Sequence, residues 1–138
     1  MDEVRAIYDE VAARPVERAC TGRTECCRFK LTGKTPLLTK GEAFVAAKAL
    51  RATGRTRLPT PVDERSGACP MLTGQGRCMI YESRPFGCRT HFCAAAGGPY
   101  ARRDVLDLIR RLEKVDAALG GDGPHPIGPA IAGALEEL

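Results

Sequence analysis

Large hydrophobic side chains are scarce in this chain of 138 residues. Tryptophan is absent, and Leu, Ile, Val and Phe together make up about a fifth of the residues, close to the level typical of disordered chains. Glycine and proline, with 15 and 10 residues, shorten any regular elements. A small chain with so little apolar material needs a second source of stability, either disulfides or a metal. The composition therefore excludes a large enzyme with an extensive core of its own.

Long apolar runs and a secretory signal are also missing. Apolar runs such as Ala43–Ala47 are far shorter than the roughly 18 residues that cross a bilayer. The start, Met1–Arg5, is acidic and lacks the basic and then apolar residues of a signal peptide. We therefore expect a cytoplasmic protein that does not bind membranes, in a compartment where disulfides are rare. The seven cysteines are an odd number and include the adjacent Cys26 and Cys27, so metal ligation is favoured over a disulfide framework.

The charge balance gives little support for nucleic-acid binding. The chain has 21 basic and 17 acidic side chains, a formal net charge of +4. Metal-ligating cysteines are thiolates, and their negative charge would neutralise much of this excess. The sequence pI of about 8.8 is also below the value typical of nucleic-acid-binding domains. The expected partner is a metal ion or cluster, a protein partner stays open, and a nucleic acid is not expected.

Four segments have the apolar spacing of amphipathic helices. We expect these helices over residues 2–14, 39–54, 100–119 and 129–138. Asp2 is the predicted cap of the first helix, and Thr39 with Glu42 forms a capping box at the start of the second. The predicted core comprises the apolar side chains on the helix stripes: Val4, Ile7, Tyr8, Val11, Phe44, Ala47, Leu50, Val105, Leu108, Ile109, Leu112, Val115, Leu119, Ile131 and Leu135.

The middle of the chain is predicted to contain a small hairpin. Cys69–Leu72 and Arg77–Tyr81 flank the turn sequence Thr73–Gly76. The sequence therefore predicts a small, mainly α single domain over residues 1–138. Its helices would surround a cysteine-rich metal-binding centre made of loops and the hairpin. Residues 20–93 would bind the metal, and residues 100–138 would form a helical C-terminal part.

The cysteines fall into two groups along the chain. Isolated structural thiols would not be expected to cluster in this way, so the grouping favours a shared metal site. Cys20, Cys26 and Cys27 precede the second predicted helix; the other group and a neighbouring histidine follow it, namely Cys69, Cys78, Cys88, His91 and Cys93. Adjacent side chains diverge, so Cys26 and Cys27 fit better on two metals, or on two irons of one cluster. Seven thiolates and the imidazole would fill two tetrahedral zinc shells. Four cysteines would equally serve an iron–sulfur cluster of the 4Fe–4S type, with thiols to spare, so spacing alone leaves both metals open.

Two arginines near Cys88 are candidates for a supporting role. Arg84 and Arg89 flank Pro85, Phe86, Gly87 and Cys88, and their guanidinium groups could donate hydrogen bonds to metal-bound thiolates. A structural salt bridge, for example to Glu82, is an equal alternative. No Ser/His/Asp set or carboxylate pair has a catalytic spacing, so catalytic residues are not identified.

The cysteine-bearing segment resembles a known family. Cys69-Pro-Met-Leu, the stretch Ile80-Tyr-x-x-Arg-Pro-x-x-Cys-Arg89 and Cys93 are similar to the signature of the YkgJ-like cysteine-cluster family of zinc- or iron-chelating domains. The upstream cysteines and the helix start at Leu38 and Thr39 resemble that family too, so the similarity covers residues 20–93. A related cysteine arrangement occurs in flagellin lysine methylases, where an iron–sulfur cluster is implied. Arg23 stands where the second cysteine of the CxxCxxCC pattern falls, which leaves a place for His91 in the ligand shell.

The resemblance implies a metal-chelating domain. We therefore expect a metal-binding cysteine-cluster protein, with an iron–sulfur cluster favoured over zinc, that serves redox chemistry, metal handling or an enzyme as an accessory. One alternative is a cluster- or thiol-dependent transferase that acts on proteins or peptides. Another is a structural-zinc adaptor that binds nucleic acid or protein. Whether the chain is itself an enzyme stays open.

Overall fold

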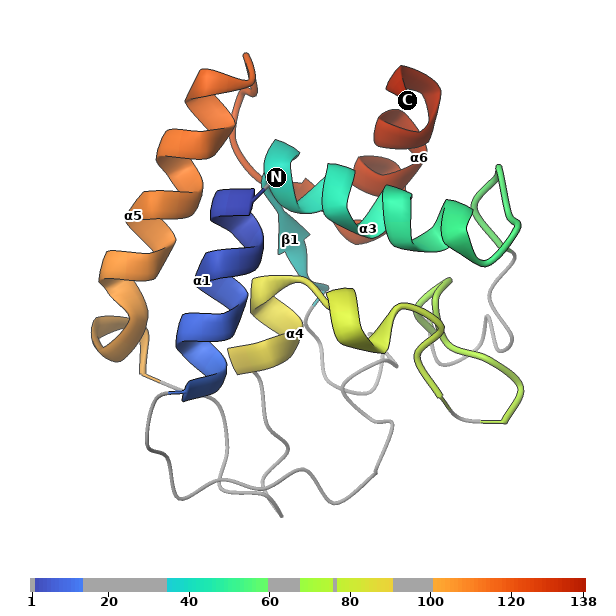
Figure 1. Cartoon of the computed structure of the whole chain (residues 1–138), viewed down its shortest axis with the longest axis horizontal. Helices are drawn as coiled ribbons and strands as arrows, with labels where there is room; N and C mark the ends of the chain where they lie inside the picture. Colours follow the sequence, from blue (N-terminus) through green and yellow to red (C-terminus); the bar gives the residue numbers. More distant parts are fainter. Residues whose placement is uncertain (1, 14–34, 60–67, 76, 91–100) are drawn as a thin grey trace.

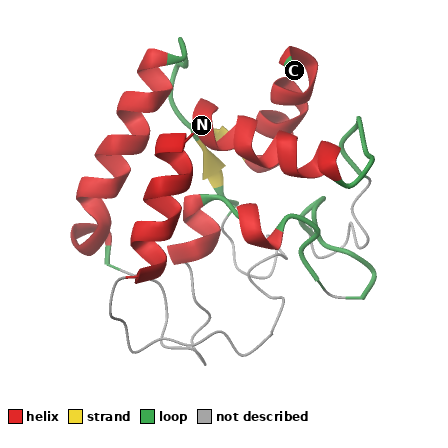
Figure 2. Cartoon of the chain, viewed as in Figure 1, coloured by secondary structure: helices red, strands yellow, loops and turns green. Residues whose placement is uncertain are grey.

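The computed structural model describes residues 2–13, 35–59, 68–75, 77–90 and 101–138, and helices dominate this part of the chain (Figures 1 and 2). The α-helices are α1 (Asp2–Ala13), α3 (Lys40–Ala52), α4 (Phe86–Thr90), α5 (Arg102–Ala118) and α6 (Ile127–Glu137). A 3-10 helix, η2 (Tyr81–Ser83), precedes α4, and two short strands, β1 (Leu37–Leu38) and β2 (His125–Pro126), complete the described elements. The small, mainly helical fold predicted from the sequence is confirmed.

Helix α3 lies at the centre of the arrangement and contacts α1, α5 and α6. Figure 1 shows α1 and α5 side by side, with α3 crossing beside them toward α6. The close approach requires a residue without a side chain at Gly41: a Cβ atom there would lie 2.8 Å from Val115 and 2.9 Å from Val4. Gly41 therefore allows the first turn of α3 to pack directly against α1 and α5.

Two apolar clusters occupy opposite sides of α3. The first joins α3 to α6 and to the segment around residues 68–80, and its buried members are Leu38, Ala43, Ala46, Ala47, Leu50, Ala68, Cys69, Met71, Leu72, Ile80, Ile127, Ile131 and Ala134. The second joins α1 to α5 and consists of Val4, Ile7, Tyr8, Val11, Val45, Phe86, Val105, Leu108 and Leu112. Most predicted core positions are therefore buried, whereas Phe44, Ile109, Val115 and Leu135 only pack partly buried against these clusters. Leu119 is also only partly buried.

The helix ends follow local signals, with two differences from the prediction. The capping box of Thr39 and Glu42 is present at the start of α3. Gly120, with a φ of 76°, closes α5 as its sequence indicated. Asp2 already lies inside the first turn of α1 rather than preceding it. Helix α6 begins two residues before the predicted Pro129, since a proline costs no hydrogen bond within the first turn.

Among the described residues, the predicted hairpin is present as an antiparallel bridge between Leu72 and Cys78. The amide of Met79 donates to the carbonyl of Met71 at 2.9 Å, and that of Thr73 donates to Arg77 at 2.7 Å. The sequence did not predict the pairing of β1 with β2, in which Leu37 lies opposite Pro126 and Leu38 opposite His125. This antiparallel pair ties the start of α3 to the start of α6.

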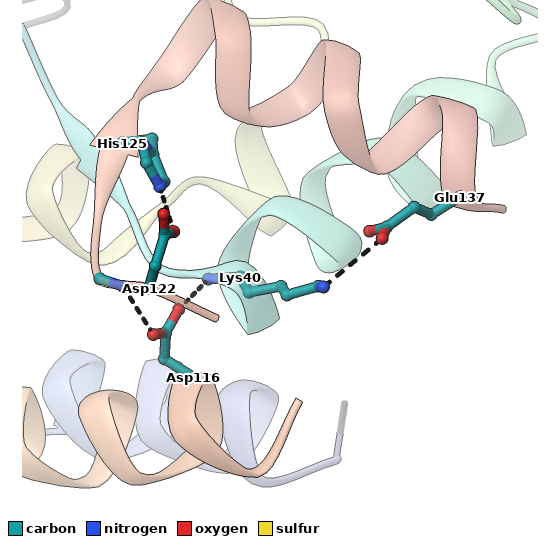
Figure 3. Close-up of polar contacts among 6 residues, drawn as sticks. Lys40, Asp116, Asp122, His125 and Glu137 are labelled. Atoms are coloured by element: carbon teal, nitrogen blue, oxygen red, sulfur yellow. Dashed lines mark hydrogen bonds and ion pairs between the residues drawn. The ribbon is translucent and has the colours of Figure 1, made fainter. Parts of the chain in front are cut away.

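A buried aspartate connects α5, α3 and the segment before β2 (Figure 3). Asp116 is only 5% exposed, and its Oδ1 accepts a hydrogen bond from the amide of Lys40 at 2.8 Å. Its Oδ2 accepts another from the amide of Gly123 at 3.0 Å. Asp116 therefore fixes the first turn of α3 against the end of α5. None of the described helices has the length and apolarity needed to cross a membrane.

Candidate metal centre

Three of the seven cysteines lie in the described residues, and all three carry thiols rather than disulfide sulfurs. Cys69 is buried in the cluster between α3 and α6, and Cys78 packs partly buried against the same cluster. Their positions follow from the hairpin, because Cys78 pairs with Leu72, whose amide in turn donates to the carbonyl of Cys69 at 2.9 Å. Cys88 is half-buried in α4.

The other predicted ligands, Cys20, Cys26, Cys27, His91 and Cys93, lie outside the described residues. Within the ranges that the structure describes, no three histidine, cysteine, aspartate or glutamate side chains come close enough to hold one metal ion. The described thiols thus do not form a complete shell among themselves. Their joint ligation with the upstream cysteines and with residues 91–93 stays a prediction.

The described thiols nevertheless have the chemistry that a zinc or iron site requires. Thiolate sulfur is the protein ligand that zinc and iron–sulfur clusters share. Cys78 and Cys88 are half-buried, and Cys69 is buried within an apolar cluster. Cys69 and Cys78 lie in or beside the hairpin and Cys88 in the first turn of α4, and tertiary contacts must hold such short segments in place.

Arg84 and Arg89 make backbone and ring contacts next to Cys88. The Arg84 Nε donates to the Tyr81 carbonyl at 2.9 Å, and the guanidinium carbon lies 3.8 Å from the centre of the Tyr81 ring. Arg89 donates to the carbonyls of Arg84 at 2.7 Å and Glu82 at 2.8 Å. Burial lowers the pKa of Arg89, and the positive charge of Arg84 adds to this effect. Hydrogen bonds from these arginines to metal-bound thiolates stay a prediction.

Glu42 forms a buried polar junction between three helices. Its side chain lies in α3 and the whole residue is 2% exposed. One carboxylate oxygen, Oε2, accepts from the Thr39 amide at 3.0 Å and from the Thr39 hydroxyl at 3.1 Å. The other, Oε1, accepts from the Phe86 amide at 2.7 Å and from the Tyr8 hydroxyl at 3.3 Å. Burial raises the pKa of Glu42, and the hydrogen bonds from its donors oppose that shift.

Tyr8 links this junction to the far end of α4. Its hydroxyl reaches Glu42, while the guanidinium carbon of Arg89 lies 4.2 Å from the centre of its ring. Burial raises the pKa of Tyr8 far above its ordinary value, with the negative charge of Glu42 as the second cause. The tyrosine therefore remains a neutral hydrogen-bond donor at any physiological pH.

The sequence predicted Glu42 only as half of a capping box and Tyr8 only as a core residue. A signal for the wider role of Glu42 was present, because it shares a helix face with Val45, Ala46 and Leu50 at the i, i+3, i+4 and i+8 positions. A glutamate on a buried stripe needs partners to offset its desolvation. Those partners lie in α1 and α4, far from Glu42 in sequence.

Comparison with known families agrees with the metal-binding chemistry of the cysteine thiols. Residues 19–109 match the CxxCxxCC family, whose description reads "Putative zinc- or iron-chelating domain". The matched range contains all seven cysteines and His91. It also covers α3, the hairpin and α4, which carry the described thiols, Glu42 and Phe86.

A curated relative matches part of the same chain. It is named 1-deoxy-D-xylulose 5-phosphate reductoisomerase, comes from Bordetella petrii, and is 38% identical over 81 residues. The alignment covers 55% of this chain and 20% of the relative, so the chain spans about a fifth of the length of that protein. No solved structure matches the chain.

Proposed function

Because this chain belongs to the CxxCxxCC family of zinc- or iron-chelating domains, we propose that its cysteines hold a polynuclear metal centre, with an iron–sulfur cluster favoured over zinc. The observation that carries the proposal is the family match, which spans every cysteine of the chain. The thiol state of the three described cysteines supports it. We assign the centre a part in redox chemistry, in metal handling or as an accessory to an enzyme.

The proposed ligands are the seven cysteines, with His91 as an additional candidate. In this proposal, the two cysteine groups bind the same metal centre, and α3 lies between them in the sequence. The ligands are Cys69, Cys78, Cys88 and Cys93 together with the upstream Cys20, Cys26 and Cys27. When bound, an iron–sulfur cluster would supply one-electron transfer, whereas zinc would supply a structural cross-link. The apolar cluster around Cys69 would keep water from one side of the centre.

The surroundings of Cys88 support a site that carries negative charge. Arg84 and Arg89 bring two guanidinium groups to the segment that contains this cysteine. Several thiolates on one metal or cluster leave net negative charge, which nearby cations stabilise. Both guanidinium groups also donate to backbone carbonyls and lie over tyrosine rings, and their positive charge would favour a thiolate at Cys88.

Metal analysis of single-cysteine variants tests the proposal. The full chain is purified without oxygen, and its iron, zinc and acid-labile sulfide are measured per chain. We expect Cys78→Ala and Cys88→Ala to lower the metal content by half or more, because each removes a ligand. Arg77→Ala is the matched control, since it changes an exposed residue of the same hairpin and keeps the Cys78 thiol. Full metal content in both cysteine variants would overturn the ligand assignment.

A further inference from the structure

Helix α4 carries Cys88 in its first turn, and the structure describes its residues Phe86–Thr90. The first turn of a helix fixes several residues in return for very few hydrogen bonds, so it needs support from tertiary contacts. The position of Cys88 therefore depends on the contacts that the rest of the chain makes with α4.

Those contacts hold the described part of α4 on both sides of Cys88. At the start of the helix, the Phe86 amide donates to Glu42 Oε1 at 2.7 Å, and the Phe86 ring is buried in the cluster of α1 and α5. On the other side of Cys88, Arg89 donates to the Arg84 and Glu82 carbonyls and lies over the Tyr8 ring. Tyr8 connects these two sets of contacts, because its ring lies beneath Arg89 and its hydroxyl donates to the same Oε1 of Glu42 that binds the Phe86 amide. Cys88 lies between the two anchored residues.

The capping box alone does not explain a carboxylate at position 42. The box uses only Oε2, and glutamine serves in that position as well as glutamate does. Burying a carboxylate costs far more free energy than burying an amide. The second oxygen receives donors from α1 and α4, and four donors around two oxygens match a carboxylate, which accepts hydrogen bonds but donates none.

We propose that Glu42 is a positioning residue for the metal centre, which fixes the first turn of α4 and thereby holds Cys88 in its ligating place. This inference rests on the proposed function, in which Cys88 is a ligand. Glu42 itself touches neither metal nor thiol in this assignment; it acts through the Phe86 amide and the Tyr8 hydroxyl.

The test compares Glu42→Gln with Asp116→Asn in the full chain. Both residues are buried acids that accept hydrogen bonds from two backbone amides, and both substitutions put an NH2 group against one of those amides. The amides bound by Asp116 belong to Lys40, in the same first turn of α3 as Glu42, and to Gly123; neither lies in α4. Asp116→Asn therefore controls for lost stability in that turn, while the Phe86 amide of α4 keeps its acceptor.

Two readouts are measured for each protein. Zn²⁺ affinity is determined by competition with a chromophoric chelator, and the visible spectrum of the Co²⁺-loaded chain reports the ligand geometry. We expect Glu42→Gln to weaken Zn²⁺ binding about tenfold or more, as changes beside metal ligands do, and to alter the Co²⁺ spectrum. Asp116→Asn should leave affinity and spectrum as in the wild type. Equal weakening in both variants, or no change in Glu42→Gln, would overturn the inference.

Two further variants cover the cases in which Glu42→Gln does not fold or Cys88 is not a ligand. If Glu42→Gln does not fold, Tyr8→Phe removes one donor to Glu42 and keeps the ring beneath Arg89; a smaller weakening in the same direction supports the inference, and unchanged binding overturns it. If Cys88→Ala binds Zn²⁺ like the wild type, Cys88 is not a ligand and the inference alone fails. A wild-type chain that binds neither zinc nor iron would overturn the proposed function and this inference with it.

Discussion

Removing the carboxylate of Glu42 should destabilise the fold in a graded way that its four donors determine. In Glu42→Gln, the amide group keeps one acceptor oxygen and replaces the other by an NH2 donor. The Thr39 and Tyr8 hydroxyls can rotate to accept from that group, but the backbone amides of Thr39 and Phe86 cannot. Whichever way the glutamine lies, one buried amide loses its partner. Such a loss costs about 1–3 kcal/mol of unfolding free energy.

The alanine variant removes both acceptors and should cost more. Thr39 and Phe86 then both lose their acceptors, so the expected loss for Glu42→Ala is about 2–6 kcal/mol, twice the figure for one amide. A domain of this size has a total stability of roughly 5–15 kcal/mol, so this variant approaches the limit of folding. Tyr8→Phe deletes one donor and leaves the Phe86 amide paired, with an expected loss of about 1 kcal/mol.

Urea unfolding of the three variants measures these differences, with free energies obtained by linear extrapolation. Glu137→Gln is the matched control, because it removes the charge of an exposed glutamate that pairs with Lys40 at 3.4 Å. Exposed pairs of this kind contribute about 0–1 kcal/mol. If Glu42→Gln unfolded like Glu137→Gln, or if the glutamine and alanine variants were equally stable, the reasoning from unpaired amides would be refuted.

Three other predictions concern the metal and one surface pair. Chelation should expose the middle of the chain, residues 20–93, to protease and leave a helical remnant, since a structural zinc supplies about 10–16 kcal/mol of apparent binding free energy. An identical proteolytic pattern with and without metal would contradict this. Cys26→Ala should lower the metal content as much as Cys88→Ala, because one site uses both cysteine groups; full metal content in the upstream variant would show that the groups are independent. The hydrogen bond from His125, at 2.5 Å, lowers the pKa of Asp122, so this contact stabilises the fold at neutral pH and is lost as the pH falls through that pKa. NMR titration of His125→Ala should show the Asp122 pKa rising toward its ordinary value, and an unchanged pKa would exclude the contact.

Features that depend on neighbouring residues could be predicted from the sequence. The start of α3 follows from Thr39 and Glu42, three positions apart, and the end of α5 from Gly120 directly after its last turn. The buried faces of α1 and α5 follow from their 3.6-residue spacing. Such signals operate within one or two turns of the chain, so the sequence alone was sufficient for them.

Features that depend on distant residues could not be predicted in this way. The strands β1 and β2 contain two residues each, and one of these is Pro126, which argues against a strand by its own preference. Helix α4 has no periodic pattern, and its start is fixed by Glu42, which is 44 residues away in sequence. The Glu42 junction could not be predicted for the same reason, because only tertiary packing brings α1, α3 and α4 together.

The most direct test of the metal centre is the iron, zinc and acid-labile sulfide content of the chain purified without oxygen, together with its absorption spectrum. We predict at least one cluster per chain, with iron and sulfide in comparable amounts and the broad visible absorption of thiolate-bound iron. Stoichiometric zinc in a colourless protein would contradict the iron–sulfur assignment and keep the chelating role. A chain that contains neither metal, and melts at the same temperature after chelation, would contradict the metal centre itself.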